Sequence, residues 1–196
     1  MADETKAPGH HDTTFATTAM LKAYAHPLRR RIAKVVAARE FARATDIAAD
    51  LGVPANTVSF HLRVLADAGM LLPAPEHARD RRDRVWKAHE GSWSVGSPDN
   101  PIEDEQLGAV FLASLAEDHI EMVRRAVRYS RDYITGRESE THGMFSQFNL
   151  RLTEAEFTAM ENRIADVIRH AQDSHDPDAP DTRFWNLDIV AADDTI

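Results

Sequence analysis

Cysteine is absent from the sequence, which excludes disulfide bonds, thiolate metal sites and cysteine nucleophiles. Long apolar runs are absent too, since none approaches the roughly 18 residues that a membrane-spanning helix needs. The first six residues are polar and charged, without the apolar core of a signal peptide. Hydrophobic residues make up 43% and charged residues 28%, a globular balance. We therefore expect a globular, cytoplasmic protein that makes no membrane contact.

Catalytic and metal-binding motifs are scarce. The chain has no Gly-x-Ser-x-Gly, no glycine-rich phosphate loop and no His-Glu-x-x-His. A loop from His170 to Asp181 gathers imidazole and carboxylate groups, but Pro177 and Pro180 stand where an EF-hand loop needs glycine and a final glutamate. We expect no enzymatic activity, no cofactor and no metal site.

Charge is divided unevenly along the chain, whose net charge is −9. Residues 22–87 carry 13 Lys and Arg against 7 Asp and Glu, whereas residues 88–196 carry 9 against 22. Because electrostatic potential is local within about 8–10 Å, an acidic half does not prevent a basic half from meeting a polyanion. The pattern indicates a basic module that meets nucleic acid, or two ordinary domains that differ in surface charge.

Apolar spacing, proline and glycine predict a small helical domain over residues 15–90, after a flexible tail at 1–14. In the third predicted helix, Thr45 is the expected N-cap and Gly52 the stop. Two short strands are expected to flank a charged hairpin tip. The predicted helices cover about 15–24, 27–36, 45–51 and 54–68, and the strands 70–72 and 85–88.

The remaining chain reads as a linker and a second region. Residues 91–102 are the linker, and 103–196 form a dimerisation or effector region. A long helix is predicted over 103–133, and a capping box at Thr153 opens a helix that ends near His170. Alternating apolar residues predict strands at 145–152 and 184–191. The expected fold class is mostly α with small β (α+β): a winged helix-turn-helix, a long helix and a C-terminal strand–helix–strand unit.

The helix expected from Pro54 has two different faces. At 100° per residue, Val58, Leu62 and Leu65 point toward the core. Groups that recognise base edges point outward: an amide, a hydroxyl, an aromatic ring and a guanidinium. These are Asn56, Ser59, Phe60 and Arg63, with Asp67 further along.

The hairpin tip is rich in arginine. Arg79, Arg81, Arg82 and Arg84 fall within six residues, where they could reach backbone phosphates or a narrow minor groove. The alternative is a solvated turn in which these arginines pair with the neighbouring aspartates.

Two segments carry a specific resemblance. Tyr24-Ala-His-Pro-Leu-Arg-Arg-Arg-Ile and Thr57-Val-Ser-Phe-His-Leu-Arg-Val-Leu-Ala-Asp-Ala-Gly-Met-Leu resemble the ArsR-type winged-helix repressors, over about residues 18–90. The resemblance implies a regulator that binds double-stranded DNA as a homodimer. By position it assigns the DNA contacts to Asn56, Thr57, Ser59, Phe60, His61 and Arg63, with backbone contacts from the wing arginines Arg79, Arg81, Arg82 and Arg84.

The chain also departs from that family. It lacks the cysteines of the soft-metal sensors, and Asp118-His119-Ile120-Glu121 does not reproduce the zinc-type site on the last helix. Metal sensing of those kinds is therefore not expected, and a small-molecule effector, if one exists, is not identified by the sequence. The C-terminal region lies outside the minimal family fold.

Apolar residues of the long helix suggest how two chains meet. Leu107, Phe111, Leu115 and Met122 form one stripe, which we interpret as a dimer contact, with intramolecular core as the alternative. Aromatic residues near the predicted C-terminal strands favour core packing over a ligand cavity. They are Phe145, Phe148, Phe184 and Trp185.

We expect a dimeric, sequence-specific transcriptional regulator, more precisely a repressor that occupies a pseudo-palindromic operator. One alternative is a winged-helix adaptor that docks on another protein without specific DNA binding. A weaker alternative is a small enzyme with a winged-helix appendage.

Overall fold

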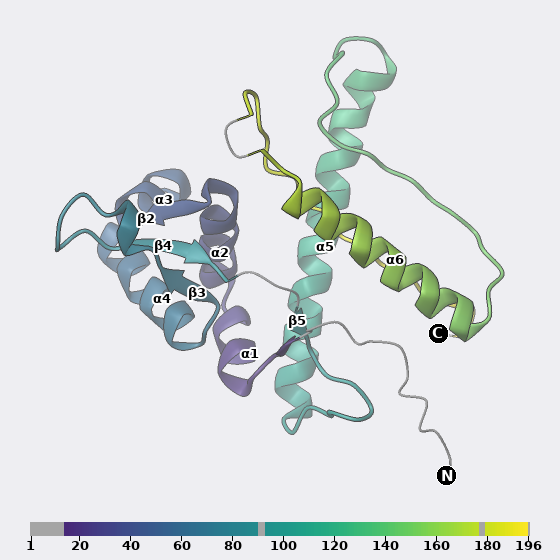
Figure 1. The fold of residues 1–196 in the computed structure, drawn as a ribbon, viewed down its shortest axis with the longest axis horizontal. Helices are drawn as coiled ribbons and strands as arrows, with labels where there is room; N and C mark the ends of the chain where they lie inside the picture. Colours follow the sequence, from purple (N-terminus) through teal and green to yellow (C-terminus); the bar gives the residue numbers. More distant parts are fainter. Residues whose placement is uncertain (1–13, 90–92, 177–178, 196) are drawn as a thin grey trace. The chain divides into compact units, whose positions relative to one another are not determined.

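The computed structural model describes residues 14–89, 93–176 and 179–195. The fold is mainly helical with a small antiparallel sheet, as the sequence predicts (Figure 1). The chain divides into two compact units after Ile120, within the long helix. Residues 1–13 of the expected tail and residues 91 and 92 of the expected linker lie outside the described residues. Among those described, no helix has the length and apolar character needed to cross a membrane.

The ends of two helices of the first unit, α2 (Pro27–Arg39) and α3 (Ala44–Leu51), have local causes that can be read in the sequence. The imidazole of His26 caps α2 by accepting a hydrogen bond from the Leu28 amide at 3.1 Å, and Pro27 occupies the first helical position. Gly52 ends α3 with φ 65°, a left-handed conformation that glycine adopts without steric cost. Arg43, not Thr45, is the N-cap of α3, and Asp46 accepts a hydrogen bond from its amide. The helices are α1 (Thr18–Tyr24), α2 (Pro27–Arg39), α3 (Ala44–Leu51) and α4 (Ala55–Asp67).

The sheet follows α4 and gains a strand that the sequence analysis did not predict. Strands β3 (Leu71–Pro73) and β4 (Val85–Ala88) are the expected hairpin, and β2 (Phe41–Arg43) pairs with the other edge of β4. All pairing is antiparallel in the order β2-β4-β3. The helix-turn-helix of α3 and α4 is therefore followed by a β-hairpin wing. A separate parallel pair joins β1 (Thr14–Phe15) to β5 (Trp93–Ser94).

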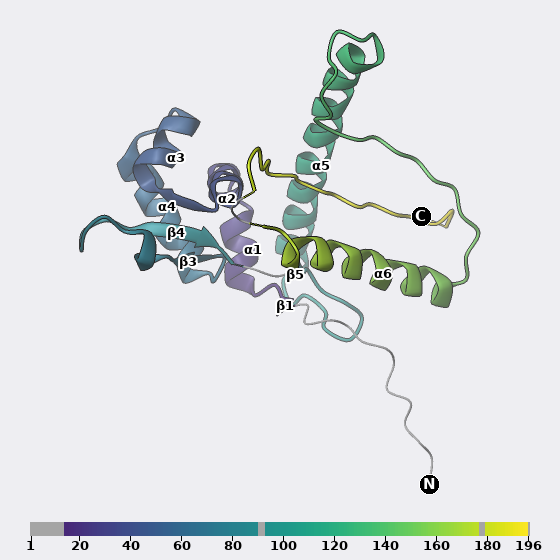
Figure 2. The same ribbon diagram turned by 45° about the horizontal axis from the view of Figure 1, so that its top comes forward.

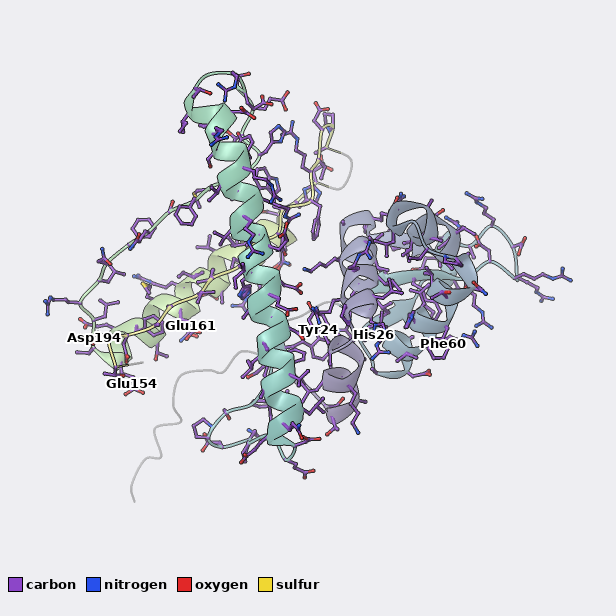
Figure 3. All side chains as sticks on the ribbon, turned by 180° about the vertical axis from the view of Figure 1, so that it is seen from behind. Tyr24, His26, Phe60, Glu154, Glu161 and Asp194 are labelled. Carbon is purple, nitrogen blue, oxygen red and sulfur yellow. The ribbon has the colours of Figure 1, made fainter. Side chains whose placement is uncertain are left out.

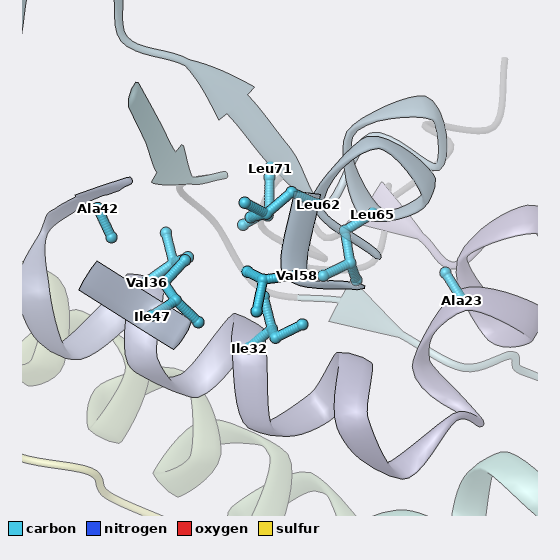
Figure 4. Close-up of a cluster of buried hydrophobic side chains, with 9 residues drawn as sticks. All are labelled: Ala23, Ile32, Val36, Ala42, Ile47, Val58, Leu62, Leu65 and Leu71. Carbon is cyan, nitrogen blue, oxygen red and sulfur yellow. The ribbon is translucent and has the colours of Figure 1, made fainter. Parts of the chain in front are cut away.

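The core of the first unit lies between α2, α3, α4 and the sheet (Figure 4). Its side chains come from every one of these elements, so the unit folds as one body. Burial is nearly complete, with Ile32, Val36 and Ile47 at 0% exposure. The cluster comprises Ala23, Ile32, Val36, Ala42, Ile47, Val58, Leu62, Leu65 and Leu71.

Helix α5 (Glu105–Ile134) is held against α2 by a charged cluster. Arg30 of α2 is buried and donates to Glu117 at 3.0 Å, and its Nε lies 3.6 Å from Asp118. Asp118 also pairs with Lys34 at 2.9 Å. Because a buried guanidinium needs a counter-charge, these carboxylates fix α5 on the winged helix.

The second unit contains α6 (Glu154–Asp173), with the capping box expected at Thr153 (Figure 2). The strands expected at 145–152 and 184–191 are wrong: both segments are coil in the structure. Alternation predicts a strand because one face is buried, but Phe148, Leu187 and Ile189 remain more than half exposed. Among the described residues, neither segment has a strand beside it to complete a ladder.

Candidate nucleic-acid interface

Helix α4 presents the two faces that its sequence predicts. Val58, Leu62 and Leu65 are 0–1% exposed and pack into the core. Asn56 and Arg63 are exposed, Phe60 is 57% exposed, and Thr57 and Ser59 are half-buried. Figure 3 labels Phe60 at the surface of the first unit. The outward face therefore offers the expected polar and aromatic groups to solvent.

Hydrogen bonds within α4 orient these groups without using all of their capacity. The Asn56 carbonyl oxygen accepts from the Thr57 amide at 2.9 Å, and the Arg63 Nε donates to the Ser59 carbonyl at 3.2 Å. Ser59 Oγ donates to the Ala55 carbonyl at 2.8 Å. In the part of the chain that the structure describes, the Asn56 amide nitrogen and the terminal nitrogens of Arg63 have no partner. These donors are available to a ligand.

His61 does not lie on this outward face, and its assignment to DNA contact stays a prediction. It is 8% exposed, its ring centroid lies 4.8 Å from that of His26, and its Nδ1 has no hydrogen-bond partner. Burial, followed by the nearby His26 and Arg29, lowers the pKa of His61 below its ordinary value. On the helix wheel it lies next to Leu65 and Val58, at the edge of the core face, and its ring packs against that of His26 at the start of α2.

The wing displays four arginines, and none of them forms an ion pair with an aspartate of the same loop among the described residues, although the charge of Arg79 helps to lower the pKa of Asp83. Arg79, Arg81, Arg82 and Arg84 are exposed, and within the described ranges none of their guanidinium groups has a carboxylate partner. Asp80 instead accepts from the Arg82 and Asp83 amides. The expected alternative, a turn of Arg–Asp ion pairs among these residues, is therefore not what forms.

Arg43 accounts for the other aspartate of the wing, and sequence reasoning did not single it out. Its Nε donates to Asp83 at 2.8 Å, and its Nη2 donates to the His77 carbonyl at 2.7 Å. Hydrogen bonds from the Arg79 amide and from Arg43 lower the pKa of Asp83. The base of the wing is further fixed by Phe41, whose ring stacks on His77 at 3.6 Å. No local pattern in the sequence signals this pairing, because the partners are forty residues apart.

A shallow groove joins α4 to the wing. It encloses about 340 Å³ and is lined by Ser59 and Arg63 of α4, Arg84 and Trp86 of the wing, and by Ala44 and Leu62. Two guanidinium groups with no carboxylate partner in the described chain thus flank one concave surface. Such a surface suits an anion with a flat neighbouring group, as in a nucleotide chain.

The residues predicted for dimerisation divide between the two units. Phe111 is 7% exposed and its ring lies 5.3 Å from that of Tyr24, so it packs inside the first unit. Leu107 and Leu115 are half-buried on the same helix, and Met122, in the second unit, accepts a hydrogen bond from Asn186 at 3.2 Å. Intrachain packing thus uses part of this stripe.

Metal-ligating side chains do not converge: within residues 14–89, 93–176 and 179–195, no three such groups could hold one ion. Asp118, considered above for a zinc-type site, is occupied by Arg30 and Lys34. The loop of carboxylates after α6 falls partly outside the described residues, at 177 and 178.

Comparison with known proteins identifies a helix-turn-helix domain at residues 24–73. Among solved structures, the AntR antimony-specific transcriptional repressor is 23% identical over 63% of this chain and 99% of that chain, with a TM-score of 0.34. The YusO protein of Bacillus subtilis is 14% identical over 77% and 79% of the two chains, also with a TM-score of 0.34. A mutant MarR from E. coli is 14% identical over 76% and 85%, with a TM-score of 0.33. No curated protein matches the chain.

Proposed function

We propose that the protein is a transcriptional regulator, a repressor that binds double-stranded DNA as a homodimer through α4 and the wing. The observation that carries this proposal is the groove between them, where Arg63 and Arg84 flank one concave surface. The helix-turn-helix match over residues 24–73 supports the same conclusion.

Each exposed group of α4 has a partner in the major groove. Arg63, with free terminal nitrogens, suits the O6 and N7 acceptors of guanine, and the free amide of Asn56 suits adenine. Phe60 offers an apolar ring to a thymine methyl group. Together these contacts would specify a short half-site.

The wing contributes affinity without sequence preference. Each guanidinium that neutralises a phosphate releases condensed counterions, so binding weakens as salt rises. Four arginines without carboxylate partners among the described residues make the wing the main source of this dependence. In a homodimer, two α4 helices would enter major grooves about one helical turn, roughly 34 Å, apart.

The test compares Arg63→Ala with Arg82→Ala on a duplex selected from a random library by the wild-type protein. Arg63→Ala should cost about 1–3 kcal/mol of binding and relax preference at one base pair. Arg82→Ala should weaken binding to all duplexes and reduce the salt slope by about 1. Fluorescence anisotropy at several salt concentrations measures both.

Arg31→Ala is the control, because Arg31 is an exposed arginine of α2 that lies outside α4, the wing and the second unit. It should leave affinity and salt slope unchanged. Failure to select any duplex sequence, or equal effects from all three substitutions, would contradict the proposal.

A further inference from the structure

The second unit, Glu121–Ile196, has many apolar side chains but no core. In its described part no residue is buried, whereas the first unit buries fourteen hydrophobic residues. Phe148 is 81% exposed and Trp185 58% exposed. The other large apolar residues of the unit that are more than half exposed are Val127, Ile134, Met144, Phe145, Leu150, Val167, Phe184, Leu187, Ile189 and Val190.

These residues are ordered into faces and are not scattered. Phe148, Leu150 and Leu152 alternate along one coil segment, and Trp185, Leu187 and Ile189 alternate along the other. Residues 144–152 and 184–187 make no backbone–backbone hydrogen bond with any residue that the structure describes. An extended segment with one apolar face and free backbone groups is a strand that lacks its neighbour.

We infer that this surface, the C-terminal apolar surface, is the interface with a second copy of the chain, and that the C-terminal unit gains its core only in that dimer. The surface is defined by residues 144–152 and 184–190 together with the exposed apolar residues of α5 and α6 after Ile120. The inference specifies the homodimer of the proposed function and does not depend on DNA binding.

The exposed area matches what a stable dimer buries. A covered aromatic side chain contributes about 150–250 Å², so Phe145, Phe148, Phe184 and Trp185 leave roughly 400–600 Å² open at their exposures. The aliphatic residues, at about 100 Å² each when fully exposed, add at least as much. The sum approaches the roughly 1,000 Å² per subunit of an obligate homodimer.

Charge distinguishes a second copy from other occupants. Residues 121–196 carry 9 arginines against 15 Asp and Glu, so their net negative charge disfavours nucleic acid and anionic lipid, and two copies can meet only where opposite charges pair locally. Both signs are nevertheless available for pairing. Within the described residues, Arg125 and Arg163 have no carboxylate partner and Glu154 and Glu161 have no cationic one. Figure 3 labels Glu154 and Glu161. A copy of the same unit offers complementary charges around a matching apolar surface.

Two-fold symmetry explains how copies of one chain can cover each other's apolar faces. In an isologous interface each surface meets its own equivalent, so every unpaired segment is supplied twice. Two copies provide four extended segments and two α6 helices, enough for a sheet covered by helices, whereas two strands alone are marginal in water.

Sedimentation velocity on the full-length protein tests the inference. The wild type should sediment at twice the 21.9 kDa chain mass at micromolar concentration. Phe148→Asp and Trp185→Asp should each raise the dimer dissociation constant by roughly 30-fold or more, as for a hot-spot residue. Phe60→Asp is the control: Phe60 is 57% exposed, nearly the same as Trp185, but lies in the other unit, so its dissociation constant should not change.

Amide hydrogen exchange gives a second readout that does not depend on a substitution. Residues 144–152 and 184–191 of the wild type should become protected as protein concentration rises through the dissociation constant, while α2 and α4 stay equally protected throughout. A wild-type monomer at tens of micromolar, or a dimer in which these segments exchange freely, would overturn the inference. So would a dissociation constant unmoved by both Asp variants, or protection obtained only with detergent or vesicles.

The results separate this inference from the proposed function. If the protein is a monomer and still selects a duplex sequence, the dimer interface is rejected and DNA binding is kept. A dimer with protected C-terminal segments that selects no duplex removes the DNA-binding role alone.

Discussion

The two units differ in how far they bury their apolar side chains. In the first, four helices and three strands enclose residues such as Ile32 and Leu65 at 0% exposure. In the second unit, α6 begins with a capping box, yet none of the described residues of that unit is buried. The contrast teaches that well-formed local structure does not supply a core. Most helical stability in proteins comes from packing an apolar face, and α6 covers its apolar residues Met160, Ile164 and Ile168 only in part.

The largest expected effect comes from replacing one isoleucine in each unit by alanine. Ile32→Ala should destabilise the protein by about 2–5 kcal/mol, because it opens a cavity in a closed core. Ile189→Ala should lower the free energy of unfolding far less, because Ile189 is 55% exposed. If a second chain covers Ile189, the loss should grow with protein concentration. Urea unfolding at two protein concentrations measures both. An equal loss from the two substitutions would erase the distinction between the units.

The charged cluster on α5 provides the next effect. Asp118→Asn should cost about 1–3 kcal/mol, because Arg30 is buried and would keep only Glu117 as a counter-charge. Glu117→Gln is the control: its side chain is 72% exposed, so the loss should be under about 1 kcal/mol. Thermal unfolding at fixed pH compares them. A larger loss from Glu117 than from Asp118 would contradict the role given to burial.

Each unit has a threonine N-cap, and the loss of such a cap typically costs about 1 kcal/mol of stability. Thr17 caps α1 and Thr153 caps α6, each through a hydrogen bond to the amide three residues later. Thr17→Ala should lower the stability of the first unit by about that amount. Thr153→Ala should reduce protection of α6 amides and leave the unfolding of the first unit unchanged. Hydrogen exchange resolves both, and a response of α2 to Thr153→Ala would show that the units unfold together.

The smallest expected effect is a pH dependence confined to the first unit. The pKa of His61 is lowered in the folded protein, so the unfolded chain binds more protons as pH falls below about 6.5. Stability should therefore decrease on acidification through that range, and His61→Phe should flatten the curve. Urea unfolding from pH 7.5 to 5 tests this. A wild-type curve equal to that of the variant would remove the buried imidazole as its cause.

Sequence patterns predicted the elements whose causes are local. Pro27, Gly52 and the spacing of Val58 and Leu62 place α2, the turn and the buried face of α4. Strand β2 was missed because three residues are too few for an alternating pattern to be recognised in the sequence. The inward position of His61 depends on its contact with His26, which no single helix wheel contains.

Much of the candidate site was likewise visible in the sequence, but its electrostatics was not. The exposed groups of α4 and the wing arginines follow from helix geometry and composition. That Asp80 and Asp83 leave those arginines unpaired depends on backbone amides and on Arg43, which only the fold brings together. The C-terminal strands were wrong because alternation reports a face to be covered and not what covers it.

The contact between Arg43 and Asp83 makes the polarity of the wing depend on a distant side chain. With Arg43 present, the Asp83 carboxylate is occupied at the base of the loop. Removing Arg43 would free that carboxylate to neutralise a neighbouring arginine, so the loop would lose positive potential although none of its own residues had changed. The strength with which this hairpin attracts anions is thus adjustable from a position that need never touch one.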